Sequence, residues 1–230
     1  MGRGADQLVV ENVHLHRGGR EVLRGVSARF RSGIVTAVVG PSGSGKTSLL
    51  RCLNRLEEPR SGRVMLDGED VRTIPPTALR QRVGMIFQTP QLFEGDVRAN
   101  LAYGLPQLRE ETAGAALEAA GLPVAFLDRD SSALSVGQAQ RVCIARALVR
   151  DPEALLMDEP TSALDKDAAA RIEKTITELA AQGLTIVLVT HNLAQARQVA
   201  RRGILLNDGT ALAEGDLDTI EATWPGEESS

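Results

Sequence analysis

The stretch GPSGSGKT, residues 40–47, follows the apolar run IVTAVV at 34–39 and precedes a helical pattern, KTSLLRCLNRL, at 46–56. Its three glycines let consecutive backbone N–H groups turn inward, where a Cβ would block close approach of an anion. The helix that follows adds unpaired N–H groups and the positive end of its dipole. A strand, a glycine-rich loop and a helix in this order predict a phosphate-binding loop in an α/β fold.

The residues of this loop are predicted to share the binding of a nucleotide and Mg²⁺. Lysine occurs only at 46, 166 and 174 in a chain with 26 basic residues, so Lys46 stands out. Its ammonium is a compact charge on a flexible stem, which can follow a phosphate in a tight loop where a planar arginine could not. The Thr47 hydroxyl is placed to bind Mg²⁺. We predict that the nucleotide contacts Gly40, Pro41, Ser42, Gly43, Ser44, Gly45, Lys46, Thr47 and Ser48, and the family resemblance given below implies that it is ATP.

Composition and charge restrict the class of partner. The net charge is −4 and aromatic residues make up 3%, which argues against binding to nucleic acid. No apolar run reaches the ~20 residues of a membrane span, and the N-terminus lacks the apolar segment of a secretory signal. Cys52 and Cys143 fall on apolar helical positions, as expected for buried thiols in a reducing compartment. We expect a cytoplasmic protein.

Short apolar runs suggest a mostly parallel sheet, at 34–39, 63–67, 83–87, 154–157, 185–190 and 203–207. Two alternating runs near 8–30 predict an antiparallel hairpin instead. Residues 89–150 carry only helical signals, and the tail 225–230 reads as frayed. The chain is thus predicted to be one domain, residues 1–230. An α/β core, 1–88 and 151–230, would carry an inserted helical subdomain, 89–150.

Several polar residues stand at the ends of predicted strands, where open α/β sheets bind ligands. ALLMDEP ends in two acids: Asp158 can hold Mg²⁺ and Glu159 can orient or deprotonate a water. His191 follows another strand and could bind the γ-phosphate or fix Glu159, or it could cap the next helix. Gln88 could contact Mg²⁺ or the water, or be an ordinary polar strand end.

The stretch LSVGQAQRVCIARAL, 134–148, is more specific. Taken in order with GPSGSGKT, LLMDEPTSALD and VTHN, it resembles the nucleotide-binding subunit of an ABC (ATP-binding cassette) transporter over nearly the whole chain. The resemblance implies a P-loop NTPase core with an antiparallel β subdomain and an inserted helical subdomain. It also points to a stand-alone bacterial subunit, and LSVGQ resembles small metal-export cassettes and their plant relatives.

The resemblance assigns roles residue by residue. Gln88 falls at the family's Q-loop glutamine, which senses Mg²⁺. Asp158 matches the Walker B acid, Glu159 the catalytic glutamate and His191 the switch histidine. Asp165 ends the D-loop, SALD. The signature comprises Leu134, Ser135, Val136, Gly137 and Gln138.

The resemblance also implies partners. In the family, the signature acts on the ATP of a second copy in a head-to-tail dimer. The subunit hydrolyses ATP to drive separate permease chains, peripheral on the cytoplasmic face of the membrane. A metal, phosphate or amino acid is the candidate solute. Leu92 and Phe93 are candidate contacts for a permease coupling helix, or they pack inside. The alternative function is an ABC ATPase of DNA repair or of the ribosome.

Two positions depart from the usual pattern. Val136 stands where the signature commonly has glycine, which requires a negative φ and a side chain that faces away from phosphate. Gly137 is then expected to approach phosphate most closely. Arg17, beside His16, stands where an aromatic residue often stacks on adenine. An arginine plane can also stack on a base, or Arg17 simply faces solvent.

Overall fold

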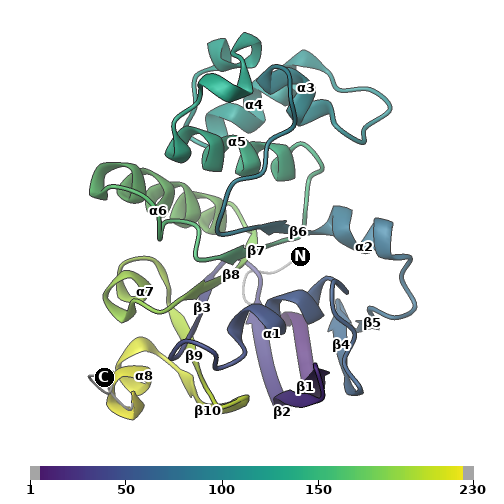
Figure 1. The fold of residues 1–230 in the computed structure, drawn as a ribbon, viewed down its shortest axis with the longest axis vertical. Coiled ribbons are helices and arrows are strands. Elements are labelled where there is room, and N and C mark those ends of the chain that lie inside the picture. The colour runs from purple at the N-terminus through teal and green to yellow at the C-terminus, as the bar shows by residue number, and fades with distance from the viewer. Residues whose placement is uncertain (1–5, 225–230) are drawn as a thin grey trace.

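The computed structural model describes residues 6–224, and the predicted frayed tail lies outside them. The strands of the described residues form two sheets (Figure 1). One sheet is antiparallel in the order β2-β1-β4-β5, and the other is mostly parallel in the order β10-β9-β3-β8-β7-β6. Their strands are β1 Asp6–Arg17, β2 Arg20–Arg31, β3 Val35–Val39, β4 Ser61–Leu66, β5 Glu69–Asp70, β6 Val83–Ile86, β7 Ala154–Asp158, β8 Thr185–Thr190, β9 Arg202–Asn207 and β10 Thr210–Gly215.

Helices cover both faces of the parallel sheet, as its continuously apolar strands predict. Along β7 the side chains alternate between two cores: Leu156 packs with α1 and the antiparallel sheet, whereas Leu155 and Met157 pack with α5 and α6. The helices are α1 Lys46–Leu53, α2 Pro76–Arg82, α3 Val97–Ala102, α4 Glu110–Ala119, α5 Val136–Leu148, α6 Lys166–Ala181, α7 Leu193–Val199 and α8 Leu217–Thr223, with short 3₁₀ turns at Val124–Asp128 and Ser131–Ala133.

The N-terminal hairpin forms as predicted. Gly18 and Gly19 join β1 to β2 with φ of 57° and 79°, the left-handed pair that a two-residue hairpin turn requires. The run at 63–67, however, was expected in the parallel sheet and instead lies in β4, antiparallel to β1. The reason is its burial: Val64 and Leu66 are buried while Arg63 is exposed, so only one face of this strand is covered.

Strand β10 has no counterpart among the predicted strands. It is rich in alanine, which strands disfavour, yet it pairs antiparallel with β9 at the edge of the sheet. Asp208 and Gly209 make the turn with φ of 44° and 76°. An Asp-Gly pair between two short runs was the hairpin signal that the sequence offered.

Helices α3, α4 and α5 lie together at one end of the molecule, beyond α6 and far from the N-terminal hairpin (Figure 1). This inserted helical part, together with the two sheets, is the fold class that the sequence predicts; its exact limits at 89 and 150 stay a prediction. Cys52 and Cys143 are free and buried, as expected. Within residues 6–224, none of the helices combines the length and apolar character needed to cross a bilayer.

Candidate active site at the phosphate loop

The loop between β3 and α1 needs glycine for steric reasons at two positions. A Cβ on Gly40 would stand 1.9 Å from the Leu206 carbonyl oxygen. Gly45, the residue before α1, has a φ of 103°, and its Cβ would stand 2.9 Å from the Val22 carbonyl oxygen. Any side chain at either position would therefore displace the neighbouring backbone and open the loop.

Lys46 is buried inside this loop. Its Nζ donates hydrogen bonds to the carbonyl oxygens of Gly40 and Pro41, both at 2.8 Å. Burial lowers the pKa of Lys46 below its usual value, although the carboxylates of Glu159 and Asp158 oppose this shift. The protein thus compensates only part of the cost of burying the ammonium charge. An anionic phosphate would favour the charged form of Lys46.

Thr47 and Asp158 meet across the site. The Thr47 hydroxyl donates to Asp158 Oδ1 at 3.0 Å, although the two residues are 111 positions apart. Burial raises the pKa of Asp158, while the Thr47 hydrogen bond lowers it and Glu159 raises it. A hydroxyl and a carboxylate side by side are hard oxygen ligands. This donor set suits Mg²⁺, which binds through one or two protein oxygens together with water and phosphate.

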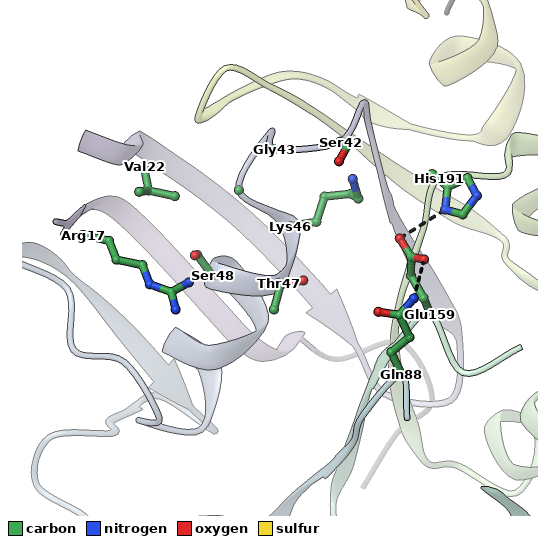
Figure 2. A pocket seen from close by; sticks show the side chains of 11 residues that line it. Arg17, Val22, Ser42, Gly43, Lys46, Thr47, Ser48, Gln88, Glu159 and His191 are labelled. Atoms are coloured by element: carbon green, nitrogen blue, oxygen red, sulfur yellow. Dashed lines mark hydrogen bonds and ion pairs between the residues drawn. The ribbon is translucent and has the colours of Figure 1, made fainter. Parts of the chain in front are cut away.

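Glu159, His191 and Gln88 form a chain of polar contacts at the same edge of the sheet (Figure 2). His191 Nδ1 lies 3.1 Å from Glu159 Oε1, and Gln88 Nε2 lies 3.5 Å from Glu159 Oε2. Glu159 has a φ of 45°, an unusual conformation for a residue with a side chain, and such residues cluster at functional sites. His191 does not cap α7, because Asn192 does so by accepting from the Gln195 backbone N–H.

One pocket of about 600 Å³ unites these residues. It is lined by Arg17, Val22, Ser42, Gly43, Gly45, Lys46, Thr47, Ser48, Gln88, Glu159 and His191. Figure 2 shows Arg17 and Val22 at the opposite end from Glu159. The Arg17 side chain is 63% exposed and lies 3.9 Å from Glu57, so it both lines the pocket and faces solvent. Val22 was not predicted, since an apolar strand residue carries no signal for a ligand.

The signature residues lie outside this pocket. Ser135 caps α5: its hydroxyl accepts from the Gln138 N–H, and Gln138 Oε1 accepts from the Ser135 N–H. Val136 is half exposed and its φ is not positive, so its side chain is accommodated as expected. Gly137 is buried, and a Cβ on it would stand 3.1 Å from the Ala168 side chain of α6, so a larger residue here would require a small shift between the two helices. Its close approach to phosphate stays a prediction.

Three further predicted residues lie away from the pocket lining. Asp165 caps α6 by accepting from the Ala168 N–H at 2.8 Å. Leu92 is partly buried and packs against the core near the helical part, and its contact with a permease stays a prediction. Phe93 is 44% exposed and stacks on Tyr103 with ring centroids 3.9 Å apart.

Sequence comparison finds a family and relatives that match most of the chain. Residues 23–162 match the profile of a family described as ABC transporter. Protein STAR1 of rice, Oryza sativa, is 48% identical over 197 residues, which cover 83% of this chain but 57% of STAR1. Phosphate import ATP-binding protein PstB 3 of Natronomonas pharaonis is 41% identical over 234 residues, covering 95% of this chain and 85% of PstB 3.

Structural comparison agrees. CbiO1 from Clostridium perfringens, part of the ABC transporter complex CbiONQ, superimposes with a TM-score of 0.87 at 29% identity. The match covers 95% of this chain and 92% of CbiO1. With the phosphate loop and the acids that face it, these matches establish that the chain belongs to the ABC transporter family, as an ATP-binding and ATP-hydrolysing subunit.

Proposed function

We propose that this chain hydrolyses Mg²⁺-bound ATP between two copies of itself and thereby drives a separate membrane permease. One observation carries the proposal. Lys46, Glu159 and His191 line one pocket, whereas the exposed Ser135 at the start of α5 is not part of its lining. A nucleotide held by the phosphate loop would therefore meet a signature only in a second, head-to-tail copy.

Within one copy, the phosphate loop and the acidic residues have different roles in binding phosphate and Mg²⁺. Lys46 and the N–H groups at the start of α1 bind the β- and γ-phosphates. Thr47 and Asp158 would hold Mg²⁺, with the Gln88 side-chain oxygen as a further ligand. When bound, the ion neutralises charge that develops on the phosphate oxygens.

Glu159 is the proposed base. Its carboxylate accepts a proton from the water that attacks the γ-phosphate, or orients that water for in-line attack. His191 at 3.1 Å holds the carboxylate in place and can bind the γ-phosphate through its other nitrogen. Arg17, at the far end of the pocket, would contact the base.

The Glu159→Gln variant tests the chemistry. The amide is almost isosteric and can keep the contacts to His191 and Gln88, so ATP should still bind while turnover falls at least about a hundredfold. With Mg²⁺ and ATP the variant should run as a dimer by light scattering, and as a monomer without ATP. Glu118→Gln, an exposed change on α4, is the matched control. Turnover at the parent rate would remove the base assignment.

Complementation tests whether the signature acts in trans. Ser135→Arg blocks the signature and Lys46→Ala disables the phosphate loop, so each variant alone should be inactive. Mixed together, they form dimers in which the intact loop of one chain faces the intact signature of the other. Recovery of hydrolysis in the mixture is expected, and a mixture as inactive as its components would contradict the dimer.

We further propose that the partner is a permease at the cytoplasmic face of the membrane. The exposed pair Phe93 and Tyr103 beside α5 is the candidate contact, with Arg146 5.3 Å from the Phe93 ring. Phe93→Ala should keep ATPase activity in solution but lose recruitment to membranes in cells. PstB 3 is named for phosphate import, so uptake of labelled phosphate by cells with and without this gene is the first transport assay.

A further inference from the structure

The amide of Gln195, on α7, joins three segments behind the active-site edge. Its Oε1 accepts from the Thr190 hydroxyl at 2.7 Å. Its Nε2 donates to the Thr161 hydroxyl and to Glu173 Oε1, the latter at 3.0 Å. Thr161 follows Glu159 by two residues, and Thr190 directly precedes His191. One side chain therefore connects the segment of Glu159 to that of His191, and both to α6.

Direct pairing between these two segments ends at the active-site edge. Pairing between β7 and β8 extends as far as Asp158 and Val189, and the Glu159 N–H still reaches the Val189 carbonyl at 3.0 Å. Beyond that point β7 and β8 no longer pair with each other, although Thr190 still pairs with Val39 of β3, and the His191 side chain is 55% exposed. The buried hydroxyls of Thr161 and Thr190, 8% and 2% exposed, anchor the diverging segments to Gln195.

We propose that Gln195 is a positioning residue that sets the separation between His191 and Glu159. The inference rests on the proposed catalytic roles of those two residues. Gln195 itself lines a second pocket of about 610 Å³, which shares Glu159 and His191 with the phosphate-loop pocket, and it is not part of the lining around the phosphate loop. It acts on the reaction only through the segments that it joins.

The geometry requires an amide at this position. The oxygen accepts from Thr190 while the NH₂ group donates to two acceptors, and a carboxylate has no hydrogen to donate. Glutamate at 195 would also place two carboxylates about 3.0 Å apart, against Glu173. The other charged groups lining this pocket are Glu159, Lys166 and His191.

Exchanging the amide of Gln195 and the carboxyl group of Glu173 between the two positions gives a direct test. Gln195→Glu should lower kcat about tenfold and leave the KM for ATP within about twofold, because the phosphate loop is untouched. In the double variant Gln195→Glu/Glu173→Gln, the new amide donates to the new carboxylate, and kcat should return to within about threefold of the parent. Gln195→Leu should lower kcat and should not be rescued by Glu173→Gln. Gln198→Glu, an exposed change one turn further along α7, is the charge control.

The outcomes separate positioning from general stability. A kcat at the parent level in Gln195→Glu would overturn the proposal. So would a loss of kcat that persists in the double variant while the thermal midpoint returns to the parent value. If Glu159→Gln also hydrolyses ATP at the parent rate, the catalytic assignment has failed instead, and the two failures are thereby distinguished.

Discussion

The Gln140 side chain joins the signature helix to the segment that carries Gln88. It is 1% exposed, and its Nε2 donates to the Phe87 carbonyl oxygen at 2.9 Å, one residue before Gln88. Its Oε1 is buried and has no hydrogen-bond partner among the described residues. The substitution Gln140→Leu, similar in size, removes both the hydrogen bond and the unpaired oxygen.

Two opposing contributions then determine how Gln140→Leu changes the free energy of unfolding. An unpaired Phe87 carbonyl costs about 1–3 kcal/mol, and less where water can reach it. Phe87 is 43% exposed, which favours the lower end of that range. Removal of the buried unpaired oxygen returns about 1–3 kcal/mol. We therefore expect the unfolding free energy to stay within about 1 kcal/mol of the parent, a midpoint shift below about 4 °C for a chain of this size.

Hydrolysis should respond more strongly than stability. Without its tie to α5 the Phe87 backbone is freer, so Gln88 spends less time beside Glu159, and kcat should fall about tenfold, or ~1.4 kcal/mol in activation free energy. Urea unfolding and steady-state ATPase rates measure the two effects, with Gln107→Leu as an exposed control. An unchanged kcat would show that the anchor is not needed. A stability loss beyond about 3 kcal/mol would show that the two terms do not cancel.

Three further predictions concern the site and the core. Burial raises the pKa of Asp158 above 3.8, so the folded chain retains this proton to higher pH than the unfolded chain, and ionisation of the carboxyl lowers stability as pH rises. Asp158→Asn should therefore melt above the parent at pH 7.5 in EDTA, with the difference closing towards pH 3, while Mg²⁺-dependent hydrolysis is lost. Arg17→Ala should reduce the preference for ATP over GTP if the guanidinium stacks on the base. Competition between the two nucleotides measures this preference, and an unchanged value would show that the Arg17 side chain faces solvent without contacting the base. Leu117→Ala leaves a cavity at a fully buried site in the helical part and should lower the free energy of unfolding by about 2–5 kcal/mol. Calorimetry should then show a thermal unfolding midpoint lower by roughly 10 °C. A shift under about 2 °C would contradict the observed packing.

The phosphate loop was predictable because its signal is local. A strand, a glycine turn and a helix occupy contiguous residues, and the same residues provide the N–H groups and the lysine that we propose bind phosphate. Asp158, Gln88 and His191 were predictable for a topological reason. Each stands at or just beyond the carboxyl end of an apolar strand, and the carboxyl ends of parallel strands meet at one edge of the sheet.

Other residues could not be found this way. Gln195 and Gln140 form hydrogen bonds with partners up to 53 positions away, and nothing in their local sequence distinguishes them from exposed glutamines. The burial of Gly137 against Ala168 depends on how closely α5 and α6 pack. Strand 61–66 joined the antiparallel sheet because only one of its faces is covered.

The sequence by itself therefore determined the fold class and the phosphate-binding chemistry, since both follow from short-range order and strand ends. Only the tertiary structure decided which side chains contact the segments of Gln88, Glu159 and His191, and that Ser135 lies apart from the pocket lining. The physical reason is that strand order and helix packing bring distant segments together, and hydrogen bonds between such segments leave no periodic trace along the chain.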